Sequence, residues 1–234
     1  MKKIIIVTGG KGRFAKILKK SKLKLNIKFP NKKQLNILNI NSIKKYLKKY
    51  NARYLIHCAA LSRPMKIHDR NISKSITINI IGTANIVKVC SELNIKLIYF
   101  STGYVYRGTK GNYKETDPIM PFNNYAWSKL GGESAVQMYK NSLILRLTMC
   151  EKPFVHKYAF SDIKTNFIFH EDVIKMLPKL LNKKGIINVG GKIQTIYKFA
   201  KKNNITVKKA SGKKFFPPNP SMNISKLKKI IKKK

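Results

Sequence analysis

The chain has 234 residues, of which 43% are hydrophobic. It is therefore long enough to bury one sizeable core and too apolar for wholesale disorder. No apolar run reaches the roughly 18 residues that a membrane-spanning helix needs, so we expect no membrane span. Lysine and arginine number 50 against 9 acidic residues, a formal net charge of +41.

This charge has two explanations that the sequence leaves open. A strongly positive field attracts nucleic acids and anionic membranes without specificity, and it also steers phosphorylated ligands. An A/T-rich genome favours lysine, isoleucine and asparagine codons, and all three residues are heavily used here. No nucleic-acid-binding motif accompanies the charge, so we expect no specific nucleic-acid partner.

The amino terminus and the cysteines indicate a reduced, intracellular setting. The amino terminus resembles a signal peptide, with a basic start (Met1, Lys2 and Lys3) followed by apolar residues. The apolar run is short and ends in glycines, which is typical of a buried strand. The three cysteines are widely spaced without a C-x-x-C pair, and the four histidines are scattered. We therefore expect reduced core thiols at Cys58, Cys90 and Cys150, no metal site, and a cytoplasmic protein.

Strand and helix patterns alternate along the chain. They predict strands over residues 3–8, 25–29, 54–58, 96–100, 143–147 and 185–189, and helices over 13–20, 42–50, 73–93 and 124–140 and in the basic carboxyl-terminal segment. Ser42 is the expected N-cap of the second helix. This alternation predicts an α/β fold, a Rossmann-like doubly wound parallel sheet with helices on both faces. After Cys150 the pattern weakens, and a proline-rich break at 216–220 precedes the last helix.

The first motif that indicates chemistry directly follows the first strand. Residues 8–15 read T-G-G-K-G-R-F-A, which fits T-G-x-x-G-x-x-A. Glycines there permit a tight turn and close approach of the backbone to a pyrophosphate at the positive helix N-terminus. An ordinary glycine turn is the alternative. The candidate cofactor-binding residues of this segment are Gly9, Gly10, Lys11, Gly12, Arg13 and Phe14.

The second motif is the pair Tyr125 and Lys129, four residues apart in a predicted helix. Residues at this spacing share one helix face, so the lysine ammonium can lie near the tyrosine hydroxyl. A free phenol has a pKa of about 10, and a neighbouring cation lowers it toward the range of an acid catalyst. In a lysine-rich chain the same spacing also arises by chance.

The third motif, Ser101-Thr102-Gly103, closes a predicted strand. Ligands of open α/β sheets bind at the carboxyl ends of the strands. The Thr102 hydroxyl could there hydrogen-bond a substrate carbonyl oxygen while a tyrosine protonates it. The alternative is a hydroxyl that satisfies a local turn.

Taken in order, the three motifs resemble the extended branch of the short-chain dehydrogenase/reductase superfamily. Further segments resemble that branch: residues 57–60 its N/H-x-A-A strand end, 79–85 its N-x-x-G-T-x-N helix, 128–133 its S-K-x-x-G-E and 218–227 its carboxyl-terminal motif. The resemblance implies that the backbone at Ala59 and Ala60 runs beside the cofactor and that Asn79 supports the active site. The implied domains are a dinucleotide-binding Rossmann core with the catalytic residues (1–150) and a reduced substrate-binding lobe packed on it (151–234).

Within this branch the segment S-T-G-Y-V-Y at 101–106, with Gly108 and the acidic stretch at 115–121, is most similar to the dTDP-4-dehydrorhamnose reductases. Gly103 stands where that group has Asp. The resemblance implies NAD(P)H-dependent reduction of a nucleotide-linked 4-keto-6-deoxy sugar. Thr102 would hydrogen-bond the keto oxygen and Tyr125 would donate the proton. Lys129 would lower the tyrosine pKa and hold the nicotinamide ribose, while hydride comes from the cofactor. Tyr125 and Lys129 therefore also count among the candidate cofactor-binding residues.

The sequence favours NADP(H) over NAD(H), which stays possible. NAD-specific members carry an acid about 20 residues after the first glycine, at the end of the second strand. Residues 29–33 contain no acid, and Lys32 and Lys33 could meet a 2′-phosphate. Asn36 replaces the family's Asp after this strand, which weakens the inference of adenine contacts.

Several alternatives stay open. The chain is shorter than typical members, mainly after Cys150, so the sugar and its nucleotide are undetermined. A sugar-nucleotide epimerase with tightly bound NAD shares the motifs, and a non-catalytic NADP-binding regulatory subunit is a remote alternative. A 4,6-dehydratase is disfavoured because Gly103 and Tyr104 stand where it needs an Asp-Glu pair. A homodimer is a candidate assembly.

Overall fold

The computed structural model describes residues 3–232, so Met1, Lys2, Lys233 and Lys234, at the ends of the basic leader and tail, lie outside the described residues. The chain divides into two compact units. The first comprises residues 1–101, 124–145 and 181–186, and the second comprises residues 102–123, 146–180 and 187–234.

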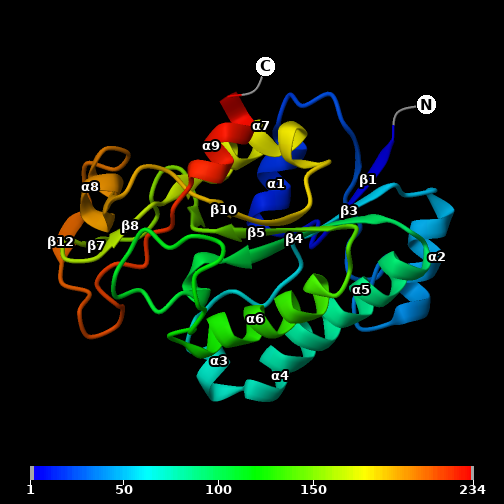
Figure 1. Cartoon of the computed structure of the whole chain (residues 1–234), viewed down its shortest axis with the longest axis horizontal. Coiled ribbons are helices and arrows are strands. Elements are labelled where there is room, and N and C mark those ends of the chain that lie inside the picture. The colour runs from blue at the N-terminus through cyan, green and yellow to red at the C-terminus, as the bar shows by residue number, and fades with distance from the viewer. Residues whose placement is uncertain (1–2, 233–234) are drawn as a thin grey trace. The chain divides into compact units, whose positions relative to one another are not determined.

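A six-stranded parallel sheet is the frame of the first unit (Figure 1). Its spatial order is β10-β5-β4-β3-β1-β2. The strands are β1 (Ile4–Thr8), β2 (Asn26–Lys28), β3 (Tyr54–His57), β4 (Lys96–Thr102), β5 (Ser142–Leu147) and β10 (Gly185–Val189). The chain moves from β1 outward to β2 and then returns to the other side of β1 with β3. The predicted Rossmann-like α/β fold is thereby confirmed, with its strand order reversing beside β1.

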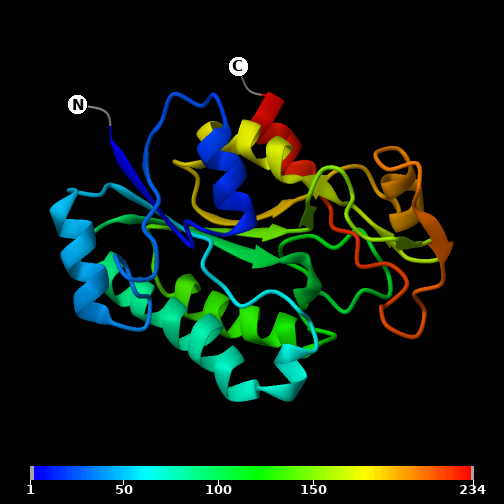
Figure 2. The same cartoon turned by 180° about the vertical axis from the view of Figure 1, so that it is seen from behind.

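Helices cover both faces of this sheet (Figures 1 and 2). The helices α2 (Ile40–Lys49), α5 (Gly82–Glu92) and α6 (Asn124–Gln137) lie on one face, and α1 (Arg13–Lys20) lies on the other. Fully buried side chains such as Ile43 and Ile86 pack against Leu55 and Leu97 of the central strands. Burial on both faces explains why β3 and β4 are buried along their whole length.

Two local predictions need correction. The helix α2 is capped by Asn39, whose side chain accepts a hydrogen bond from the Ser42 backbone N–H, so Ser42 is not the N-cap. The helix predicted over 73–93 is three segments: α4 (Ile72–Ile76), a π-helical turn η1 (Thr77–Ile81) and α5, preceded by the short α3 (Ile67–Arg70). The hydrophobic spacing does not reveal the π-helical turn η1, because the apolar residues on either side of it still face the sheet.

The second unit consists of short elements around an aromatic core. These are η2 (Gly103–Val105), β6 (Met149–Cys150), β7 (Tyr158–Phe160), β8 (Lys164–Thr165), β9 (Ile168–Phe169), α7 (His170–Leu180), β11 (Gln194–Thr195), α8 (Ile196–Lys201), β12 (Lys208–Ala210) and α9 (Ser225–Lys232). Three two-stranded pairings (β11-β8, β12-β7 and β6-β9) surround buried Phe154, Phe169 and Phe199. Strands of two or three residues leave little periodicity, which explains the weak sequence pattern here.

Across residues 3–232, no helix combines the length and apolar character needed to cross a membrane. Within the same range no cluster of three or more His, Cys, Asp or Glu side chains could hold a metal ion. Cys58, Cys90 and Cys150 are not part of a disulfide bond.

Candidate active site

The glycine-rich turn between β1 and α1 packs directly on the ends of two neighbouring strands. A Cβ atom on Gly9, whose φ is +71°, would lie 3.0 Å from the backbone of Ala59. A Cβ on Gly10 would lie 2.8 Å from the carbonyl group of Phe29. The missing side chains therefore leave a backbone-lined cradle that any larger residue would fill.

The N-terminus of α1 opens at this turn. Gly12 is its N-cap, without a side-chain hydrogen bond, and its first turn contains no acidic residue. The orphan backbone N–H groups and the helix dipole thus favour an anion here. Lys11 and Arg13 are exposed beside the turn, and an Arg13 Nη atom donates a hydrogen bond to Ser62 Oγ at 3.3 Å. Phe14 instead turns its buried ring into the core.

The other expected cofactor residues lie on two segments, one after β3 and one after β2. The backbone N–H of Ala59 donates to Thr8 Oγ1, which fixes Ala59 against the turn, and Ala60 follows it with intermediate exposure. Lys32 and Lys33 are exposed on the loop after β2. Asn36 uses its side chain locally, because its Oδ1 accepts from the Leu38 backbone N–H.

Tyr125 and Lys129 lie one turn apart on α6. The Lys129 side chain is 3% exposed, and its Nζ lies 4.1 Å from the ring centroid of Tyr99. The Tyr99 hydroxyl donates to the Lys129 backbone carbonyl. Burial lowers the pKa of the Lys129 ammonium to about 7, while Cys58 and Glu133 act in the opposite direction. The lysine therefore titrates close to neutrality.

Asn79 is connected to the helix of Tyr125 by hydrogen bonds. It lies in η1 and is 1% exposed. Its Oδ1 accepts from Leu61 N–H, and its Nδ2 donates to the Leu61 carbonyl and, at 2.8 Å, to Ser128 Oγ. Ser128 Oγ in turn donates to the Tyr125 carbonyl at 2.7 Å. The structure thus brings together Asn79, Ser128 and Tyr125.

The sequence did not reveal His68, which contacts Tyr125. The two rings meet edge to face with centroids 5.2 Å apart. His68 Nδ1 lies 2.7 Å from the Ser75 hydroxyl oxygen, whereas its buried Nε2 has no hydrogen-bond partner. Burial lowers the pKa of His68. No spacing rule connects α3 with α6, so nothing in the sequence pointed to this contact.

Thr102 ends β4 and belongs to the second unit. Its side chain is 4% exposed and accepts a hydrogen bond from Tyr104 N–H at 3.2 Å. The next residue, Gly103, stands where the family has Asp. A Cβ there would lie 2.8 Å from Thr148 Cγ2 and 2.9 Å from Met222 Sδ, so a side chain at this position would require these neighbouring side chains to shift.

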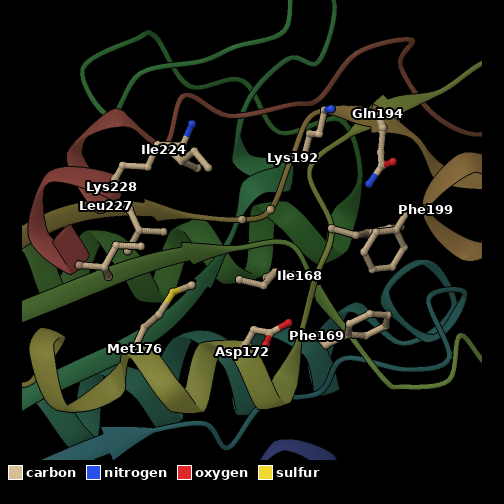
Figure 3. A pocket seen from close by; sticks show the side chains of 14 residues that line it. Ile168, Phe169, Asp172, Met176, Lys192, Gln194, Phe199, Ile224, Leu227 and Lys228 are labelled. Atoms are coloured by element: carbon tan, nitrogen blue, oxygen red, sulfur yellow. The ribbon is translucent and has the colours of Figure 1, made fainter. Parts of the chain in front are cut away.

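The second unit also contains an apolar groove of about 400 Å³ between α7, α9 and the loop after β10 (Figure 3). Its lining residues are Phe167, Ile168, Phe169, Asp172, Met176, Gly190, Gly191, Lys192, Gln194, Phe199, Ile224, Leu227, Lys228 and Ile231. Asp172 forms an ion pair with Lys175. None of the residues expected from the sequence to bind cofactor or substrate lines this groove.

The frame described above matches a known family. The model of the RmlD substrate binding domain matches residues 1–152. The chain belongs to this family. The match confirms the resemblance to the sugar-nucleotide reductase and epimerase group that the motifs indicated.

Curated relatives match a smaller part of the chain. Methionine adenosyltransferase 2 subunit beta of Pongo abelii is 33% identical over 107 residues, which is 46% of this chain and 32% of the relative. A probable low-salt glycan biosynthesis reductase, Agl14 of Haloferax volcanii, is 32% identical over 117 residues, 49% of this chain and 39% of the relative. The matched part thus spans about a third of the length of these relatives.

Solved structures match nearly the whole chain. The dTDP-4-dehydrorhamnose reductase of Bacillus anthracis, in complex with NADP, has a TM-score of 0.86 at 24% identity and covers 97% of this chain and 91% of its own. A hypothetical reductase of the same name from Sulfolobus tokodaii gives 0.84 at 23% identity, covering 99% and 95%. The UDP-glucose 4-epimerase of Thermus thermophilus, complexed with NAD, gives 0.76 at 17% identity, covering 97% and 92%. At these identities the likeness establishes the shared fold.

Proposed function

We propose that the RmlD-family chain reduces a nucleotide-linked 4-keto-6-deoxy sugar with a nicotinamide cofactor. The observation that carries this proposal is the arrangement on α6, where a buried Lys129 lies one turn after Tyr125 and Asn79 holds the same helix through Ser128. Structural neighbours named dTDP-4-dehydrorhamnose reductase support this choice of substrate class.

The glycine-rich turn is the proposed cofactor site. The cradle left by Gly9 and Gly10 and the open N-terminus of α1 suit a pyrophosphate. Lys11 and Arg13 add positive charge beside it. The acid-free loop after β2, with Lys32 and Lys33 exposed, favours NADP(H), while NAD(H) stays compatible with the same cradle.

A nicotinamide cofactor held at the glycine-rich turn would supply hydride to the keto carbon. The Tyr125 hydroxyl donates its proton to the keto oxygen, so that the carbonyl becomes an alcohol and the tyrosine becomes a phenolate. By the family resemblance, the Thr102 hydroxyl would donate a hydrogen bond to the keto oxygen. Lys129, in its ammonium form, would stabilise the phenolate and would be the residue that holds the nicotinamide ribose. Asn79 and Ser128 hold the first turns of α6, which fixes the direction of the proton donor.

The test is to follow nicotinamide absorbance with a panel of nucleotide-linked 4-keto sugars, in wild type and in Tyr125→Phe. We expect oxidation of NADPH that depends on both the sugar and the tyrosine. If no member of the panel oxidises either cofactor above the Tyr125→Phe background, the proposal is wrong. Isomerisation of a nucleotide sugar without net change in absorbance would instead identify an epimerase.

A second candidate is a dinucleotide-binding subunit without turnover. The observation in its favour is that the first curated relatives are named as subunits of methionine adenosyltransferase. The same assay separates the two functions, because such a subunit would bind NADPH and yet leave every sugar of the panel unchanged.

A further inference from the structure

A buried histidine connects the glycine-rich turn to the helix that follows η1. His57, at the end of β3, lies between Thr8 at the end of β1 and Thr83 on α5. Its Nδ1 is 2.8 Å from Thr8 Oγ1, and its Nε2 is 3.1 Å from Thr83 Oγ1. All three residues are 1% exposed. These bonds therefore cannot be exchanged for bonds to bulk water.

The neighbouring bonds determine the direction of each hydrogen bond. The Thr83 hydroxyl donates to the Asn79 carbonyl at 2.7 Å, and with its hydrogen so placed Thr83 Oγ1 accepts from His57 Nε2–H. Nδ1 is then an acceptor and receives the hydroxyl hydrogen of Thr8. Thr8 Oγ1 accepts in turn from Ala59 N–H at 3.2 Å. A neutral imidazole protonated on Nε2 satisfies every one of these bonds.

The surroundings of His57 favour this neutral form. Burial lowers its pKa to about 3, and the nearby Lys129 of α6 acts in the same direction. The ring of Tyr99 on β4 stacks on the imidazole, with centroids 5.8 Å apart. The groups that face His57 from the packed elements are thus two hydroxyls, a phenol ring and an ammonium group.

The chain of bonds continues beyond Thr83. Asn79, whose carbonyl accepts from Thr83, donates through its side chain to Ser128 Oγ, which donates to the Tyr125 carbonyl. Two directed series of hydrogen bonds, joined through the covalent frame of Asn79, thus connect the residue before Gly9 with the backbone of Tyr125.

We propose that His57 is a positioning residue that couples the placement of the glycine-rich turn to the placement of Tyr125. The inference rests on the proposed function in so far as Tyr125 is taken as the proton donor and the turn as the dinucleotide site. Its consequence is that a change at Thr83, on a helix away from the turn, weakens dinucleotide binding.

The first test titrates NADPH against Thr83→Val, which keeps the side-chain shape and loses the hydroxyl. We expect affinity to fall roughly fivefold, the worth of one buried hydrogen bond, and Thr83→Ser to restore it. Ser91→Ala is the matched control, because Ser91 also lies on α5 and its hydroxyl donates to a helix carbonyl, that of Lys88. Equal affinity in wild type, Thr83→Val and Ser91→Ala would overturn the coupling.

The second test needs neither cofactor nor substrate. Nitrogen-15 NMR of the His57 ring should show the neutral Nε2–H form, without titration, from pH 5 to pH 8.5. Thr83→Val should speed hydrogen exchange of the Ala59 amide, which lies at the other end of the path. An Nδ1–H tautomer, a titration in this range or unchanged exchange would contradict the inference. If the wild type binds NADPH and turns over no sugar, the proposed function is wrong. The NADPH titrations and the NMR and hydrogen-exchange measurements still test the coupling in that case.

Discussion

Ser101 on β4 donates a hydrogen bond to the carboxylate of Glu133 on α6. Ser101 is 5% exposed and Glu133 is fully buried. The bond joins the strand to the helix one residue before Thr102 and one helical turn after Lys129. Since Glu133 also raises the pKa of Lys129 against the effect of burial, this carboxylate both anchors the helix and favours the ammonium form of the lysine.

Glu133→Gln should therefore shift the pH dependence of turnover. The amide still accepts a hydrogen bond from Ser101 but removes the negative charge that favours the Lys129 ammonium. The pKa of Lys129, about 7 in the wild type, should fall, so activity that needs the ammonium is lost at lower pH. We expect a larger drop in kcat/KM at pH 8 than at pH 6.

The control for this experiment is Glu92→Gln, which removes a carboxylate that pairs with Lys44 on the surface. Its pH profile should match that of the wild type, because exposed ion pairs contribute little. A Glu133→Gln profile that is lowered equally at every pH would mean that the carboxylate acts on structure alone.

Tyr125→Phe should remove the proton donor and leave the fold intact. We expect turnover to fall by about 10²-fold or more, because the variant loses the positioned acid. NADPH affinity should be nearly unchanged, because the ring and Lys129 are retained. Lys129→Met should reduce both quantities, since its proposed role is double. Steady-state kinetics and NADPH titration of both variants check this. Wild-type turnover by Tyr125→Phe would exclude Tyr125 as the donor.

The fold could be predicted from the sequence because its signals are local. Continuous apolar runs marked the buried strands β1, β3 and β4, and the turn at 9–12 marked the start of α1 at its observed first residue, Arg13. The predicted N-cap at Ser42 was wrong because Asn39, three residues earlier, offers the same chemistry. Competition between equivalent capping residues is decided by where the chain enters the helix, which the sequence does not encode locally.

The environment of the candidate site could be predicted less well. Motif spacing indicated Tyr125, Lys129 and Asn79, but the contact of His68 with Tyr125 and the bonds of His57 join segments far apart in the sequence. Such contacts depend on which helices and strands become neighbours in the folded protein, and local sequence patterns do not specify this. Likewise, the close packing around Gly103 depends on Thr148 and Met222, which only the tertiary structure brings beside it.

The stability of the protein should rise with pH across the mildly acidic range because of His57. Its pKa is about 3 in the folded state against 6.5 for an ordinary histidine, so the unfolded chain binds a proton that the folded chain does not. The free energy of unfolding therefore increases as pH rises from about 3 to 6.5. Between pH 5 and pH 7.5 this one group contributes about 2 kcal/mol.

Urea unfolding of the wild type and His57→Gln at the two pH values measures this contribution. Other groups titrate in the same range, so the difference between the two proteins is the relevant quantity. The variant should show a smaller gain in unfolding free energy from pH 5 to pH 7.5. Equal gains in both proteins would mean that the imidazole is not buried in its neutral form.

NADPH should bind more tightly than NADH because of the loop after β2. Gly10 lies against Phe29, so a ribose bound at the turn would face the segment that follows, where Lys32 and Lys33 are exposed and no acid occurs between residues 29 and 33. Lys32→Ala/Lys33→Ala should weaken NADPH binding and leave NADH binding unchanged.

The matched control is the double variant Lys19→Ala/Lys20→Ala, which removes the same amount of charge at the other end of α1. Titrations at near-physiological salt are needed, since low salt exaggerates the phosphate contribution. If NADH binds as tightly as NADPH, or if both double variants weaken NADPH equally, the preference does not come from these lysines.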